Sequence, residues 1–342
     1  MDTLKLVEAG LRAFDARLPE VSPARCLVTR YRASSCRRCL DVCPGAAIAC
    51  EGWLAVDPDR CTSCGTCAAV CKTGALSFEG RSLALRDHLY AAVQHGQRHA
   101  CISCRCCGAL EPPSDGRAGD IRVHCLGGIS AADLIGAAAC RMSQIELRSA
   151  PCGACVDAKA DGAVDAALEA AESVLTSLGV EIVLERSCIG AAPDLKSTSE
   201  LVRGVSAAGV SRRELLSFFA RGLRRTVAEG TAPRKRSVAE LHTQAPLPGA
   251  HDRLVRDLAA LGMSTSHKPA RLPATMPLGA VTIGDVCNVC GLCVKYCPHG
   301  SIHLESGRLE VDNLRCTACR LCAEVCPPEA ISVRPATLPV TV

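Results

Sequence analysis

The sequence has few large side chains from which to build a core. Its 342 residues include four Phe, three Tyr and one Trp, so aromatic residues make up only 2% of the chain. So few aromatic rings offer little surface for stacking nucleic-acid bases, and the net charge of +4 gives only a weak attraction to phosphates. The composition therefore argues against nucleic acid as a partner.

Long apolar runs are also missing. No segment approaches the ~18 consecutive apolar residues of a membrane-spanning helix, and charged residues interrupt every apolar stretch at the N-terminus. Apolar residues at helical spacing instead predict an amphipathic helix over residues 1–24, and no export signal. We therefore expect a cytoplasmic protein without direct membrane insertion, in which cysteine thiols stay reduced.

Cysteine is abundant, with 26 residues. In a reducing compartment, so many cysteines indicate bound metal rather than disulfides. Metal centres would also compensate for the small supply of large apolar side chains. The cysteines fall into a C-terminal, an N-terminal and a central group.

The C-terminal group repeats one pattern, CxxCxxCxxxCP. Its two runs are Cys287, Cys290, Cys293 and Cys297, then Cys316, Cys319, Cys322 and Cys326. Three thiolates at intervals of three residues can bind three corners of a cubic cluster from one tight loop. Structural zinc, the alternative, usually takes two CxxC pairs separated by a longer stretch. Alternating apolar residues between and after the runs predict short strands.

With this double run, residues 281–336 resemble the bacterial two-cluster ferredoxins. The resemblance implies an α+β ferredoxin-like domain with two 4Fe-4S clusters, in which the last cysteine of each run binds the cluster of the other run. The implied ligand sets are Cys287, Cys290, Cys293 and Cys326 for one cluster, and Cys316, Cys319, Cys322 and Cys297 for the other.

Residues 25–90 contain a second, less regular copy of this domain. A partial run precedes a complete one, and their cysteines are Cys36, Cys39 and Cys43, then Cys61, Cys64, Cys67 and Cys71. The resemblance implies two more 4Fe-4S clusters. Their ligands would be Cys61, Cys64, Cys67 and Cys43 for one, and Cys36, Cys39 and Cys71 with a fourth group for the other. The complete run also ends in Cys71-Lys72, where the pattern has Cys-Pro.

The fourth ligand of the partial run must come from elsewhere, because Ala33 stands where the opening cysteine belongs. Cys26 lies upstream, on the correct side of the motif, and is the candidate that we favour. Cys50 is the other candidate, but the other three runs have an apolar strand residue at its position, which favours a buried apolar role. A 3Fe-4S cluster without a fourth ligand is the remaining alternative.

Between these domains, residues 98–188 alternate in type. The pattern predicts strands over 121–126, 145–148 and 180–185, with helices over 130–140, where Ser130 is the N-cap, and 163–178. Such alternation predicts a small central α/β domain with a parallel sheet. Cys125 and the pair Cys152 and Cys155 follow strands, so they are expected at the carboxyl edge of the sheet, where such folds place their sites.

Three features of this region resemble the delta subunit of methyl-viologen-reducing hydrogenase: an opening CxxC, Cys125 within VHCLGG, and the closing pair CGAC. The resemblance implies a further iron-sulfur cluster, of the 2Fe-2S type, and electron transfer between hydrogenase or formate dehydrogenase and heterodisulfide reductase. Its candidate ligands are Cys101, Cys104, Cys125, Cys152 and Cys155. The chain departs from that family in the short spacing of the closing pair and in the additional Cys106 and Cys107.

Residues 189–280 are expected to form a helical and proline-rich linker. A basic amphipathic helix is predicted over 211–229, with either a solvated face or a docking face for an acidic partner. The prolines between residues 246 and 277 predict an extended connector with one short helix, over residues 252–261.

Motifs for nucleotide binding or hydrolysis are missing from the sequence. We therefore expect a non-catalytic electron-transfer subunit whose partners are other subunits of a flavin- or metal-containing redox complex. The alternative is a thiol/disulfide or sulfur-compound reductase with the central cysteines as its active site, because a CxxC at a helix N-terminus is also typical of a redox dithiol.

Overall fold

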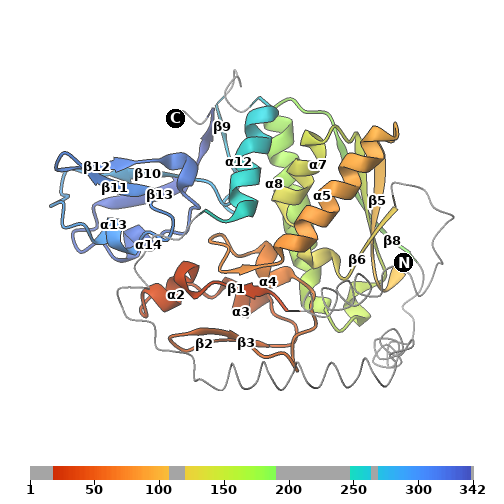
Figure 1. Cartoon of the computed structure of the whole chain (residues 1–342), viewed down its shortest axis with the longest axis horizontal. Helices are drawn as coiled ribbons and strands as arrows, with labels where there is room; N and C mark the ends of the chain where they lie inside the picture. Colours follow the sequence, from red (N-terminus) through yellow and green to blue (C-terminus); the bar gives the residue numbers. More distant parts are fainter. Residues whose placement is uncertain (1–17, 108–119, 190–246, 263–268, 340–342) are drawn as a thin grey trace, which may run out of the picture.

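The computed structural model describes residues 18–107, 120–189, 247–262 and 269–339. Most of the helix predicted over residues 1–24 and all of the basic helix predicted over 211–229 lie outside these ranges. The described chain consists of an N-terminal unit, a central unit and a C-terminal unit (Figure 1).

The N-terminal unit, residues 18–78, is built from short elements around its cysteines. They are β1 (Glu20–Val21), the 3-10 helix η1 (Pro23–Arg25), α2 (Leu27–Arg30), α3 (Arg38–Val42), β2 (Ile48–Cys50), β3 (Leu54–Val56), α4 (Thr66–Ala69) and β4 (Leu76–Ser77). Strand β1 pairs antiparallel with β4, and β2 pairs antiparallel with β3. The buried apolar cluster of this unit has only six members, two of which are cysteines.

The C-terminal unit, residues 279–339, repeats this plan. Its elements are β10 (Gly279–Ile283), α13 (Leu292–Tyr296), β11 (Ile302–Glu305), β12 (Arg308–Val311), η6 (Asn313–Arg315), α14 (Leu321–Glu324), β13 (Ile331–Pro335) and β14 (Thr337–Leu338). The alternating apolar residues predict β11, β12 and β13, but sequence analysis missed β10, which pairs antiparallel with β13. The buried cluster again has six members, and three are cysteines.

The central unit contains a four-stranded parallel sheet in the order β6-β5-β7-β8. Its elements are α5 (Glu79–Gln94), β5 (His99–Cys104), β6 (Asp120–Val123), η2 (Leu126–Gly128), α7 (Ala131–Ala139), β7 (Gln144–Ser149), η3 (Cys152–Ala154), η4 (Ala158–Ala160), α8 (Asp161–Ser177), β8 (Val183–Cys188), α12 (Gly249–Ala260) and β9 (Ala270–Arg271). Ser130 caps α7 as predicted, accepting from the Asp133 amide at 3.3 Å. The helices gather on one side of the sheet (Figure 1).

Helices α5 and α12 complete the core of the central unit. Leu85 and Leu89 of α5 are buried in it, as are Leu254 and Leu258 of α12. The sequence predicts a short helix within an extended connector here. Helix α12 lies where that helix is predicted, but it packs against the core, because leucines four residues apart place an apolar stripe on one face of the helix. This apolar cluster has 30 buried members, including Ala336 and Leu338 of the C-terminal unit, whereas the main cluster of each terminal unit has six.

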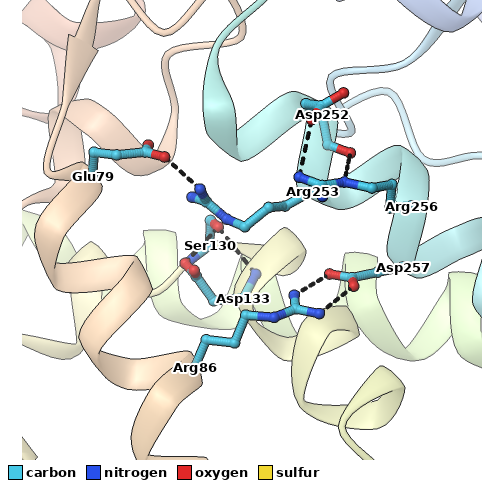
Figure 2. Close-up of polar contacts among 8 residues, drawn as sticks. All are labelled: Glu79, Arg86, Ser130, Asp133, Asp252, Arg253, Arg256 and Asp257. Atoms are coloured by element: carbon cyan, nitrogen blue, oxygen red, sulfur yellow. Dashed lines mark hydrogen bonds and ion pairs between the residues drawn. The ribbon is translucent and has the colours of Figure 1, made fainter.

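Ion pairs fix α12 to α5, as Figure 2 shows. The two terminal nitrogens of Arg86 each lie 2.6 Å from a carboxylate oxygen of Asp257, and Arg253 pairs with Glu79. A bidentate, charge-assisted pair of this kind is both strong and directional. Helix α12 also contacts the C-terminal unit, because His251 Nε2 lies 2.7 Å from the Leu314 carbonyl oxygen.

The N-terminal and C-terminal units pack directly against each other. Leu27 of α2 shares a buried cluster with Leu321 and Val325 of the C-terminal unit. The rings of Tyr31 and Tyr296 meet edge to face, 5.6 Å apart. Among the described residues, no helix has the length and apolar character that a membrane crossing requires.

Candidate metal centres

The three complete cysteine runs share two left-handed backbone positions. The first lies two residues after the opening cysteine and the second directly after the next cysteine; they are Ser63 and Gly65, Val289 and Gly291, and Ala318 and Arg320. Left-handed backbone is costly for any residue except glycine, so a shared tight loop must be strongly specified. The partial run lacks it, since Arg37, the counterpart of Gly65, has φ −127°.

The last cysteine of each run accepts a backbone hydrogen bond in three of the four cases. Amides donate to sulfur from Ala47 to Cys43 and from Ala75 to Cys71, both at 3.2 Å, and from Ser301 to Cys297 at 3.3 Å. Such bonds favour a thiolate over a thiol, and the thiolate is the form that binds iron. The partial run therefore keeps the hydrogen bond to its last cysteine, although it lacks the left-handed turns of the complete runs.

The partial run lies within a group of five thiols. Burial raises the pKa of the Cys39 thiol to about 12, with smaller contributions from neighbouring Cys71, Cys26, Cys36 and Cys50, in that order. The Cys26 and Cys50 sulfurs are 3.7 Å apart. The structure thus brings both candidates for the fourth ligand close together. Cys26 raises the pKa of Cys39 more than Cys50 does.

Cysteines of the other three sets also lie close to one another. Burial raises the pKa of Cys67, with contributions from Cys64, Cys61, Cys39 and Cys43. It likewise raises the pKa of Cys322, with contributions from Cys319, Cys316 and Cys297. Burial raises the pKa of Cys293 as well, with contributions from Cys287 and Cys290. Cys326 packs against the apolar cluster that contains Cys293.

These donor sets suit clusters better than single ions. In the described ranges, no three His, Cys, Asp or Glu side chains converge on a single metal-ion position. A cluster has a different requirement, because each of its thiolates binds a separate iron atom. Groups of thiols supported by N–H donors match that requirement, and thiolate is the preferred ligand of iron-sulfur clusters.

In the central unit, five thiols line one cavity at the carboxyl edge of the sheet. They are Cys104, Cys106, Cys125, Cys152 and Cys155. The Cys106 and Cys155 sulfurs are 3.9 Å apart, and those of Cys104 and Cys107 are 3.6 Å apart. Hydrogen bonding with the Cys106 thiol lowers the pKa of both Cys104 and Cys155.

Cys101 lies apart from this cavity. It pairs in register with Glu146 of β7 and contacts that carboxylate. Residues three apart on a strand project to opposite faces, so Cys101 and Cys104 cannot reach the same site. The alternation was visible in the sequence, whereas the position of Cys106, beyond the end of β5, was not. We therefore replace Cys101 by Cys106 in the central set.

Two arginines lie beside the central thiols. Arg186 donates to the Cys152 sulfur at 3.6 Å and pairs with Asp161 and Asp165. Arg105 forms an ion pair of 3.2 Å with buried Asp157. Arg105 favours the thiolate form of Cys155, whereas burial and Asp161 outweigh Arg186 and raise the pKa of Cys152 to about 11.

Comparison with known families supports the terminal sites. Residues 54–77 match a 4Fe-4S binding domain, and residues 286–332 match a 4Fe-4S dicluster domain. No curated protein and no solved structure gave a significant match. The chain thus contains ferredoxin-type iron-sulfur domains near both ends, which confirms the predicted 4Fe-4S clusters in kind and supports a role in electron transfer. The resemblance of residues 98–188 to the hydrogenase delta subunit stays a prediction.

Proposed function

We propose that the chain is an electron-transfer subunit in which five iron-sulfur centres form one line from the C-terminal unit to the central unit. Clusters bound there would supply one-electron transfer. In order, the ligands are Cys287, Cys290, Cys293 and Cys326 for centre 1; Cys316, Cys319, Cys322 and Cys297 for centre 2; Cys26, Cys36, Cys39 and Cys71 for centre 3; Cys61, Cys64, Cys67 and Cys43 for centre 4; and ligands drawn from Cys104, Cys106, Cys125, Cys152 and Cys155 for centre 5.

The contacts between successive groups of cysteines carry this proposal. Within the C-terminal unit, Cys293 and Cys297 lie at the two ends of α13, so this one short helix joins centre 1 to centre 2. In the N-terminal unit, Cys67 of α4 and Cys71, which follows this helix, join centre 4 to centre 3 in the same way. Each terminal unit therefore couples its own two centres.

Across the boundary between the terminal units, centre 2 adjoins centre 3. Cys319 and Cys36 pack against the same buried cluster of Leu27, Leu321 and Val325. Leu27 directly follows Cys26, a proposed ligand of centre 3, and Leu321 lies between two ligands of centre 2. The apolar contact therefore brings the two binding sites together.

Centre 4 adjoins centre 5 at the boundary with the central unit. The Cys64 thiol is one of the neighbours that raise the pKa of Cys125, after burial and Asp157. His124, next to Cys125, donates from Nε2 to the Thr62 carbonyl at 2.6 Å. A Cβ at Gly65 would lie only 3.0 Å from the Gly128 Cα, so these two backbones meet closely.

Centre 1 supplies the end of the line that faces solvent. Cys290 is exposed, and so are the neighbouring apolar side chains of Val286 and Val289, at 66% and 41%. Exposed apolar residues around a redox centre fit a contact surface for another subunit. We propose that a partner in a larger redox complex exchanges electrons here.

A second candidate function rests on the number of thiols in the central cavity. Five cysteines line it, whereas a 2Fe-2S cluster takes four, and Cys106 and Cys155 are already in contact. A reductase of disulfides or other sulfur compounds would use such a thiol pair, with the other centres as its electron supply. Rapid alkylation of Cys106 and Cys155 in the iron-loaded protein would favour this function over a fifth centre.

The proposed order of the five centres is tested by removing centre 3, which lies in the middle. The double variant Cys36→Ser, Cys39→Ser should lose centre 3, while Cys140→Ser, at the end of α7, serves as a matched control. In the fully reduced full-length protein, electron paramagnetic resonance should detect magnetic coupling between neighbouring centres. The double variant should simplify the signals of both centre 2 and centre 4. If only the signal of centre 3 disappears and the others keep their shape, the proposed order is wrong.

A further inference from the structure

Arg30 of the N-terminal unit reaches into the C-terminal unit. It is the last residue of α2 and is only 4% exposed. Its Nε donates to the Tyr296 carbonyl at 3.0 Å, and its Nη2 donates to the carbonyls of Lys295 at 3.0 Å and Cys297 at 3.4 Å. The guanidinium therefore lies at the end of α13, directly beside a ligand of centre 2.

The electrostatic surroundings of Arg30 point to the same centre. Burial lowers the pKa of Arg30, while the Cys297 and Cys319 thiolates oppose this effect. A buried cation is costly unless negative charge lies nearby. Main-chain carbonyls solvate the guanidinium but carry no net charge. Thiolates bound to a cluster would place negative charge beside it.

Lys72 is a second cation at this boundary. It directly follows Cys71, at the position where the other runs have proline, and its Nζ donates to the Ala274 carbonyl on the segment that leads to the C-terminal unit. Burial and the nearby Arg38 and Arg320 lower the pKa of Lys72 to about 8, and Cys319 and Cys316 oppose them. Lys72 thus lies, like Arg30, near ligands of centre 2.

We propose that Arg30 and Lys72, both supplied by the N-terminal unit, raise the reduction potential of centre 2 and hold the two units together. Reduction adds negative charge to a cluster, and nearby positive charge stabilises the reduced state more than the oxidised state. The departure from Cys-Pro at Lys72 then has a function, because proline could not place a charge there. Centre 2 would accept electrons more readily than centre 1, which lacks these contacts.

This inference rests on the 4Fe-4S dicluster match of residues 286–332 and not on the proposed line. Its test is a redox titration of the full-length, iron-loaded protein, followed by electron paramagnetic resonance. The signal lost in Cys319→Ala identifies centre 2. Arg30→Gln and Lys72→Met should each shift the potential of centre 2 to a more negative value, and the double variant should shift it further. Centre 1 should keep its potential in all three variants.

Two controls separate charge from packing. Arg30→Lys keeps the positive charge and should restore most of the potential, while Arg308→Gln removes an exposed charge on β12 and should leave centre 2 unchanged. If Arg30→Gln does not fold, Lys72→Met still tests the proposal, because Lys72 is only half-buried. An unchanged potential of centre 2 in Lys72→Met, with full iron content, would overturn the role of this residue. The same result in Arg30→Gln would overturn the whole proposal.

Discussion

The N-terminal and C-terminal units have the same plan but different binding loops. In each unit a hairpin separates the two cysteine runs, β2-β3 in one and β11-β12 in the other, and the strand after the second run pairs with a strand before the first. The C-terminal unit has a complete run at both positions, whereas the N-terminal unit lacks one cysteine and the left-handed turns that accompany it. The difference shows that the scaffold of strands persists when a binding loop degenerates.

The position of Cys26 suggests how the N-terminal unit compensates. This cysteine precedes α2, outside the run, yet it is buried beside Cys36 and Cys39. A fourth ligand supplied by Cys26 would make the opening loop unnecessary, and the left-handed backbone that positions the opening cysteine elsewhere would then not be required. The family matches follow the same division, since they cover both runs at the C-terminus but only the second at the N-terminus.

The largest expected effect is the loss of both terminal units when iron is removed. The main apolar cluster of each has only six buried members, including cysteines, which is too few for a stable core without bound clusters. Chelation should therefore abolish their thermal transitions, while the central unit, which contributes most of a 30-member apolar cluster, keeps a cooperative one. Calorimetry and hydrogen exchange on the metal-free protein measure this. Protected amides in either terminal unit without iron would contradict it.

The difference between the two units is tested further by removing, one at a time, the two candidates for the fourth ligand of the partial run. Cys26→Ala should convert one 4Fe-4S centre into a 3Fe-4S centre, with its paramagnetic signal in the oxidised state, because the fourth iron loses its proposed ligand. Cys50→Ala should leave all centres intact. The opposite pair of results would assign the ligand to Cys50, and an unchanged spectrum in both would mean that either sulfur can serve.

The double variant Cys26→Ala, Cys50→Ala separates these cases, since the two sulfurs are 3.7 Å apart and one could replace the other. It should show the three-iron signal whichever cysteine is the native ligand. In the C-terminal unit, Cys287→Ala provides the matched control, because it removes an opening cysteine that has no such neighbour in its run.

The smallest effect concerns equivalent glycines in the two units. Gly65 has φ +87° and a Cβ there would meet the Gly128 Cα at 3.0 Å, whereas Gly291 has φ +75° and open space around it. Gly291→Ala should cost only the backbone penalty of about 1 kcal/mol. Gly65→Ala should lower the thermal midpoint further, because rigid backbone in the central unit must move. Equal losses would mean that the contact at Gly128 is unimportant.

The sequence predicts the local features of this molecule well. The spacing of cysteines identifies the runs, alternation of apolar residues identifies β11, β12 and β13, and Ser130 identifies the start of α7. These signals are local, because a loop, a strand or a cap is specified by residues close together in the chain.

Contacts between distant segments could not be predicted in the same way. The burial of α12 in the central core, the reach of Arg30 into the C-terminal unit and the meeting of Cys26 with Cys50 all depend on tertiary packing. The exclusion of Cys101 is an intermediate case. Once β5 is known to be a strand, the alternation of its side chains places Cys101 and Cys104 on opposite faces. The CxxC spacing instead indicated a loop in which both cysteines bind the same cluster.

The central claim, that the N-terminal unit binds two clusters as the C-terminal unit does, is tested most directly by counting iron and acid-labile sulfide. Four 4Fe-4S centres and one central 2Fe-2S centre require about 18 irons per chain in anaerobically prepared protein, with equal sulfide. About 16 would leave the central thiols unoccupied and favour the reductase. A count of about 8 would contradict the account, because the N-terminal unit and the central unit would then both lack iron.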